Sequence, residues 1–135
     1  MKTAKVYIET GADGYDIRMN GKENGLDYGL LGQGRTIEEA KADFLDAYME
    51  MKEAYAEMGR PFAEVEFDYH YDMTSFLRQY AYIFSLAGLS RMTGINQGQL
   101  SHYINGVSKP TEKTINRIQN SILSFANELS SVRFA

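Results

Sequence analysis

Four polar side chains between Gln97 and His102 have the types and spacing needed to read DNA bases. They belong to the segment TGINQGQLSHYINGVSKP, residues 93–110, and they are Gln97, Gln99, Ser101 and His102. A glutamine amide can hydrogen bond to N6 and N7 of adenine together, and a serine hydroxyl can bond to several base edges. This chemistry requires a helix that enters the major groove with these side chains facing outward. The sequence therefore predicts base readout if its neighbours hold such a helix in place.

The flanking residues predict two short helices joined by a tight turn. The first covers about 89–93 and ends at Gly94, and the second covers about 97–104 with Asn96 as its N-cap. The inward positions of the second helix are Leu100 and Ile104. Two helices with a small residue at the turn are typical of a helix-turn-helix. The alternative interpretation is a small helical bundle with a polar surface helix.

Two further helices are expected on either side of this pair. One begins near Met73, capped by Asp72 or Thr74, and its apolar positions are Phe76, Leu77, Tyr80, Ile83 and Phe84. The other is capped by Thr111 and runs to about Leu129, with one apolar stripe of Ile115, Ile118, Ile122, Phe125 and Leu129. The later residues of that stripe either form a dimer seam or pack onto the sheet of the same subunit.

Charge is distributed unevenly along the 135 residues. Residues 1–71 hold 8 Lys/Arg and 15 Asp/Glu, a net charge of −7, whereas residues 72–135 hold 6 Lys/Arg and 3 Asp/Glu, a net charge of +3. Only the basic part needs to approach phosphates, and the cations placed to do so are Lys109, Lys113 and Arg117. The split predicts two domains, 1–71 and 72–135, with different partners.

The acidic part predicts a sheet covered by one helix. Strand patterns occur at 4–8, 15–19 and, more weakly, 26–32, separated by the turn signals GADG (11–14) and NGKENG (20–25). A long helix follows, with a capping box of Thr36 and Glu39 and an end at Gly59 and Pro61. A fourth strand is expected over 62–71. The fold class is therefore α+β, with a β-β-β-α-β sheet domain before an all-α domain.

Known enzyme motifs are absent from the sequence. There is no cysteine, and no HExxH, GxSxG or P-loop pattern occurs. Carboxylates such as Asp16 and Asp27 could hold magnesium, which leaves a divergent nuclease as an alternative. His70 could have a minor role as a metal ligand or general base. We expect no enzymatic activity, no cofactor and no metal.

The aromatic stripe of the acidic part offers another function. Its residues are Tyr48, Tyr55, Phe67 and Tyr69. They could line a pocket, which would make the chain a transcription regulator that senses a small molecule. The N-terminus lacks the apolar core of a signal peptide, and no apolar run approaches the length of a membrane span. We therefore expect a cytoplasmic protein without membrane contact.

Nearly the whole chain resembles a family of bacterial regulators. The segment TGINQGQLSHYINGVSKP is similar to the helix-turn-helix of Cro and phage repressors. Together with YGLLGQGRTIEEAKADFLDAYMEM and the strand VEFDYHYD, it resembles HicB-type antitoxins of toxin–antitoxin systems. The resemblance implies an N-terminal domain like a partial ribonuclease H fold, without that enzyme's activity.

The resemblance also implies partners and contact residues. The N-terminal domain would neutralise a small basic HicA-type toxin that cleaves mRNA, and the C-terminal domain would repress its own promoter as a homodimer or larger assembly. Carried onto this chain, the implied DNA contacts are Asn96, Gln97, Gly98, Gln99, Ser101 and His102, with Lys109 near the backbone. An acidic domain suits a basic RNA-binding toxin because complementary potentials favour encounter.

Overall fold

The computed structural model describes residues 1–11 and 13–135. In this part of the chain it is an α+β protein with one four-stranded mixed sheet and five helices, which confirms the α+β part of the prediction. The chain forms two compact units, Met1–Asp72 and Met73–Ala135, here called the sheet unit and the helical unit. The turn predicted at Gly11–Gly14 includes Ala12, which lies outside the described residues.

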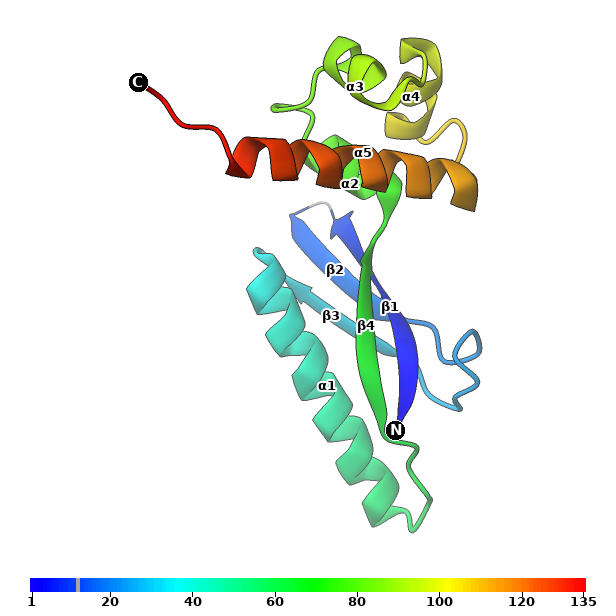
Figure 1. Cartoon of the computed structure of the whole chain (residues 1–135). Helices are drawn as coiled ribbons and strands as arrows, with labels where there is room; N and C mark the ends of the chain where they lie inside the picture. Colours follow the sequence, from blue (N-terminus) through cyan, green and yellow to red (C-terminus); the bar gives the residue numbers. More distant parts are fainter. Residues whose placement is uncertain (12) are drawn as a thin grey trace. The chain divides into compact units, whose positions relative to one another are not determined.

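The sheet unit contains four strands in the order β3-β2-β1-β4 (Figure 1). They are β1 (Lys2–Gly11), β2 (Gly14–Met19), β3 (Leu30–Gly34) and β4 (Val65–Tyr71). Pairing is antiparallel between β1 and β2 and between β2 and β3, whereas β4 runs parallel to β1. A parallel neighbour requires a crossover connection. Helix α1 (Ile37–Glu57) supplies it and lies along one face of the sheet in Figure 1.

Alternation along the strands separates a covered face from an open face. Ala4, Val6 and Ile8 of β1 are buried on the side of α1, as their two-residue spacing predicts. Phe44 of α1 is fully buried against this face. The intervening residues of the strands form the open face, defined here by Lys5, Tyr7, Glu9, Asp16, Arg18, Leu31, Gln33, Glu66, Asp68 and His70.

The ends of α1 follow from local side chains. Thr36 is the N-cap, and its hydroxyl accepts a hydrogen bond from the Glu39 N–H at 3.1 Å. The Glu39 carboxylate accepts from the N–H of Arg35 at 2.9 Å, one residue before the N–H that a capping box predicts. Gly59 follows the helix with a φ of 66°, the left-handed conformation that glycine adopts most readily.

Two strands begin later than predicted. The third strand begins at Leu30 instead of residue 26, because Tyr28 turns into the core, where it is 5 % exposed and donates to the carbonyl of Ala63 at 2.6 Å. The fourth strand begins at Val65 instead of residue 62, because Phe62 stacks on the ring of Tyr28 at 4.7 Å. Aromatic packing at this end of the sheet therefore shortens both strands.

The helical unit contains α2 (Met73–Gln79), α3 (Leu86–Thr93), α4 (Gln97–Ile104) and α5 (Glu112–Ser130). Its core is built from Leu77, Leu89, Leu100 and Tyr103. The first helix is shorter than predicted, because α2 ends at Gln79. Tyr80, Ile83 and Phe84 therefore lie beyond it, and Ile83 is 58 % exposed. Helix α3 starts three residues earlier than expected, because the hydroxyl of Ser85 caps it by accepting from the Gly88 N–H.

Candidate nucleic-acid interface

The turn between α3 and α4 is fixed by a left-handed glycine and a hydroxyl group. Gly94 has a φ of 75°, and its N–H donates to the carbonyl of Ser90 at 2.8 Å. The Thr93 hydroxyl donates to the Leu89 carbonyl at 2.7 Å and accepts from the Ile95 N–H at 3.2 Å. These bonds satisfy the backbone groups at the end of α3 and set the direction in which α4 leaves.

Helix α4 is anchored on its inner face and at both ends. Leu100 is fully buried, as predicted, and Tyr103 is 6 % exposed, although no inward role was predicted for it from the sequence. Asn96 caps the N-terminus, since its side-chain oxygen accepts from the Gln99 N–H at 2.8 Å. At the other end, the Arg78 guanidinium donates to the carbonyl of Ile104 at 2.9 Å.

The polar groups on the outer face of α4 differ in their exposure and in whether they are hydrogen bonded within the protein. Gln97, Gly98 and His102 are exposed, and no side-chain hydrogen bond engages Gln97 or His102 within the described residues. Gln99 is half-buried and donates from its amide nitrogen to the Ser108 hydroxyl at 3.3 Å. Ser101 is half-buried too, and its hydroxyl accepts from the Asn105 amide at 3.2 Å.

The predicted contact residues thus fall into two groups. The first group, Gln97, Gly98 and His102, is available to a ligand. In the second group, Asn96, Gln99 and Ser101, one polar atom of each side chain is hydrogen bonded within the protein. Asn96 keeps both amide N–H groups of its side chain for an outside acceptor. The structure places all six on α4 or at its N-cap, and Lys109 follows in the exposed loop between α4 and α5.

Three cations were predicted to contact phosphates. Lys109 and Lys113 are exposed, and Lys113 lies in the first turn of α5. Arg117 has a structural contact as well, because its Nε donates to the carbonyl of Thr93 at 2.8 Å. Arg117 therefore ties α5 to the end of α3 while remaining an exposed residue.

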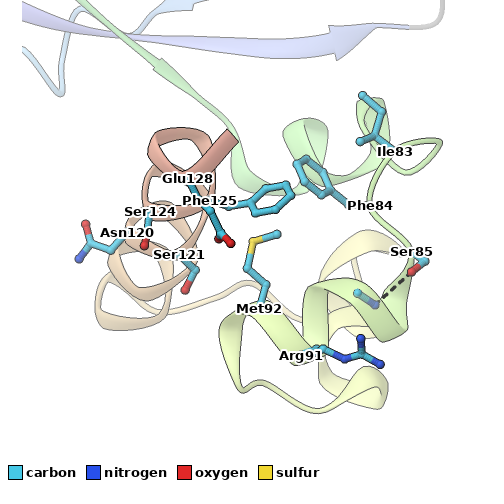
Figure 2. Close-up of a pocket in the computed structure, with 11 residues that line it drawn as sticks. Ile83, Phe84, Ser85, Arg91, Met92, Asn120, Ser121, Ser124, Phe125 and Glu128 are labelled. Atoms are coloured by element: carbon cyan, nitrogen blue, oxygen red, sulfur yellow. Dashed lines mark hydrogen bonds between the residues drawn. The ribbon is translucent and has the colours of Figure 1, made fainter. Parts of the chain in front are cut away.

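A groove of about 780 Å³ lies between α3 and the C-terminal half of α5. Figure 2 shows Phe125 of α5 beside Phe84, with Met92 of α3 next to them. Phe125 belongs to the apolar stripe of α5, in which Ile118 is fully buried but Leu129 is 53 % exposed. The stripe is thus covered in its first half and open towards its end.

The open face of the sheet unit carries a network of charged groups. Its interactions are the ion pair Arg18–Glu9 (2.7 Å) and the hydrogen bonds His70–Asp68 (2.7 Å), Tyr7–Glu23 (2.6 Å) and Gln33–Asp16 (3.1 Å). The hydrogen bond to the Glu23 carboxylate raises the pKa of the Tyr7 phenol. Most of these acids are satisfied by neighbours on the sheet.

The residues considered for a nuclease lie at opposite ends of β2 and β3. Asp16 is paired with Gln33 near one end, whereas Asp27 precedes β3 at the other end and forms an ion pair with Arg60 at 2.9 Å. Across residues 1–11 and 13–135, no three Asp, Glu or His side chains gather as metal ligands would. Asp16 and Asp27 therefore do not form a common site.

The aromatic stripe packs on itself. The rings of Tyr48 and Phe67 are 5.0 Å apart, and those of Tyr55 and Phe62 are 5.3 Å apart. Tyr55 is 4 % exposed, and Phe67 and Tyr69 pack against the core of the sheet unit. These rings fill the space between α1 and the sheet.

In the part of the chain that the structure describes, no helix has the length and apolar character needed to cross a membrane. Comparison of the chain with protein-family models, with curated proteins and with solved structures finds no match.

Proposed function

We propose that the chain is a HicB-type antitoxin that represses its own promoter and neutralises a small basic toxin that cleaves mRNA. In this proposal α3 and α4 act as a helix-turn-helix, and α4 enters the major groove. The sheet unit acts as a partial ribonuclease H-like domain that covers the toxin. The proposal assigns binding roles and no catalytic role to the chain.

The exposed polar face of α4 carries the DNA-binding half of the proposal. Gln97 and His102 are outward and uncommitted, while Leu100 and Tyr103 hold the opposite face in the core. A helix anchored in this way can present donors and acceptors to base edges without rearranging. Lys109 and Lys113 lie beyond the C-terminus of α4, where they supply the sequence-independent attraction to phosphates.

The surplus of three positive charges is small, so affinity for DNA is expected to come from two copies reading two half-sites. The open half of the α5 stripe, around Phe125 and Leu129, supports a homodimer because a second copy would cover its apolar surface. The net charge of −7 in residues 1–71 supports a basic partner for the sheet unit.

A mobility shift tests the DNA-binding half. The purified chain is mixed at fixed salt with the DNA upstream of its own coding sequence, and random DNA serves as competitor. We expect a complex that survives competitor in large excess. Retention no better than that of random DNA would reject sequence-specific repression by the chain alone.

An RNA-cleavage assay tests the antitoxin half. A small basic protein encoded next to this chain is the candidate toxin, and its cleavage of mRNA is measured with and without the chain. We expect the chain to stop cleavage at a one-to-one ratio of the two proteins. Undiminished cleavage, with the chain still bound to its promoter, would leave a repressor that is not an antitoxin.

A further inference from the structure

The backbone of β4 alternates between groups that face β1 and groups that face away from the sheet. The N–H of Asp72 donates to the carbonyl of Ile8 at 2.8 Å, and Ile8 is in register with Tyr71. In a parallel ladder this pattern directs the backbone groups of every second residue towards the neighbouring strand. The N–H and C=O groups of Phe67 and Tyr69 therefore point outward, along the edge where the strand order ends.

The two edges of the sheet are protected unequally. On β3 and the residue after it, the outward N–H of Gln33 donates to Asp43 at 2.8 Å and that of Arg35 donates to Glu39 at 2.9 Å. On β4, the first outward N–H has such a partner too, because Val65 donates to the Tyr48 hydroxyl at 3.2 Å. Among the described residues, no hydrogen bond is made to the outward backbone groups of Phe67 or Tyr69.

The side chains beside this edge differ between the two faces. Glu66 and Asp68 are exposed on the open face, where Asp68 also contacts Nε2 of His70 at 2.7 Å. Phe67 and Tyr69 are half-buried on the face of α1, with ring centroids 6.2 Å apart. A strand placed next to β4 would alternate between a neighbourhood of carboxylates and a neighbourhood of aromatic rings.

We infer that the edge of β4 at Phe67 and Tyr69 binds an extended segment of another protein in which basic and apolar side chains alternate. The segment adds a strand to the sheet by pairing with the outward groups of Phe67 and Tyr69. Its Lys or Arg side chains lie beside Glu66 and Asp68, and its apolar side chains lie beside the two rings. This inference rests on the proposed function in one respect: the segment is assigned to the basic toxin.

A second copy of the chain is the less suitable occupant. Pairing β4 with β4 of another molecule would bring Glu66 and Asp68 next to an identical acidic row on the same face of the extended sheet. Like charges on adjacent strands are destabilising. Charge complementarity thus favours a basic segment over self-association.

Amide hydrogen exchange of the full chain, followed by NMR, tests the inference. The probe is a capped peptide as long as β4 in which lysine and valine alternate. Without peptide, we expect the Phe67 and Tyr69 amides to exchange much faster than that of Asp68, which faces β1. With peptide at about ten times its dissociation constant, these two amides should slow roughly tenfold because only free protein exchanges.

Backbone pairing is separated from simple charge attraction by two N-methylated peptides. Each carries N-methyl groups on one of the two alternating sets of residues, so that only one peptide loses the N–H groups that face β4. We expect one methylated peptide to bind like the parent and the other to lose binding. Equal binding of both would overturn strand addition.

Side-chain recognition is tested with the double variant Glu66→Lys and Asp68→Lys, which changes exposed residues. We expect it to bind the lysine–valine peptide about tenfold more weakly, since two favourable charge pairs become repulsive. A matched peptide that alternates glutamate and valine should show the opposite preference. Unchanged affinity for both peptides would overturn the assignment of a basic segment.

Two results in the free chain would also overturn the inference. Slow exchange of Phe67 and Tyr69 at every protein concentration would mean that the chain itself covers the edge. Protection that increases with protein concentration would assign the edge to a second copy. Failure of the toxin assay with these peptide results intact would reject the toxin as partner while keeping the binding edge.

Discussion

At the scale of single residues, the side chains of the α4 region differ in whether they are free to bind DNA or are engaged in holding the helix. Gln97 is exposed and uncommitted, whereas Asn96 caps the helix through its side-chain oxygen. Lys109 is exposed in the loop after α4. A residue that reads bases and a residue that contacts phosphates have different signatures in binding experiments.

Gln97→Ala is expected to weaken binding to the specific promoter by about 1–3 kcal/mol and to relax base preference, because a bidentate contact to a base is lost. Lys109→Ala should weaken binding to all sequences alike. It should also reduce the slope of the logarithm of the binding constant against the logarithm of salt concentration by about one. Fluorescence anisotropy at several salt concentrations measures both effects. Gln119→Ala, an exposed change on α5, is the control. Small and equal effects of the first two variants would mean that α4 is not the reading element.

Gly94→Ala is expected to destabilise the helical unit more than Gly106→Ala. Both glycines have positive φ values, 75° and 73°, so both variants incur roughly 1 kcal/mol of backbone strain. A Cβ at Gly94 would also lie 2.6 Å from Nη2 of Arg117, whereas nothing lies within 4 Å at Gly106. If the guanidinium of Arg117 gives up its Nε bond to Thr93 in moving aside, the loss adds about 0.5–1.5 kcal/mol. Urea unfolding gives both values, and equal losses would contradict this role of Arg117.

The pKa of Tyr28 predicts a loss of stability at high pH. Burial raises this pKa from 10.0 to about 12, so between these values the unfolded chain releases the proton while the folded chain retains it. Folding stability from this residue is therefore complete below about pH 10 and decreases as the pH rises towards 12. Urea unfolding across this range should show a smaller decrease for Tyr28→Phe than for the wild type. A decrease of equal slope in the variant would assign the effect to other tyrosines.

At the scale of elements, the sequence predicts most helices and strands because their signals are local. The period-two pattern of β1, the Thr36 cap of α1 and the Asn96 cap of α4 need only neighbouring residues, and the structure has each of them. The boundaries of β3 and β4 depend instead on packing of Tyr28 and Phe62, which are 34 positions apart in the chain. The unprotected edge of β4 also depends on the order of the strands, which no local pattern encodes.

The glycines of β3 illustrate how a weak strand signal can mark a packing site. A Cβ at Gly32 would lie 2.5 Å from the backbone nitrogen of Phe44 and 2.6 Å from the carbonyl oxygen of Ala40. The backbone of α1 therefore approaches β3 as closely as it does only because residue 32 has no side chain. The glycine-rich composition of this segment gives only a weak strand signal. Composition cannot show that a helix packs on the segment and requires the glycine.

Gly32→Ala is expected to reduce the free energy of unfolding of the sheet unit by about 1–3 kcal/mol, because α1 must shift away from β3. Leu31→Ala is the control, since Leu31 is 51 % exposed on the open face and its change should fall within about 0.5 kcal/mol. Thermal unfolding followed by circular dichroism measures both variants. A Gly32→Ala protein as stable as the wild type would mean that the backbones of α1 and β3 do not meet this closely.

At the scale of the whole molecule, charge and symmetry determine how the protein would engage DNA. Residues 1–71 carry −7 and residues 72–135 carry +3, so DNA is expected to approach only the helical unit and to be repelled by the sheet unit. One helical unit has few cations for a long contact. Stable binding is therefore expected to need two helical units in one assembly.

Two reading helices related by a twofold axis impose a spacing on the promoter. We expect two half-sites whose centres lie about 34 Å apart, or a multiple of that distance, because both helices must meet the same side of the duplex. Footprinting on the upstream DNA measures the spacing. Inserting about five base pairs between the half-sites should abolish joint binding, while inserting about ten should restore much of it. If neither insertion changed the binding to the two half-sites, each helical unit would bind its half-site independently.

The parallel pairing of β1 with β4 also has a consequence for synthesis on the ribosome. Lys2 at the start of the chain is in register with Val65, so β1 emerges long before the strand that completes its ladder. Until then β1 can pair only with β2, and its other side remains available to any nascent or misfolded chain nearby. The contacts within the helical unit span shorter stretches of sequence and can form soon after that unit emerges. The sheet unit, although made first, is therefore expected to be completed only when β4 has emerged.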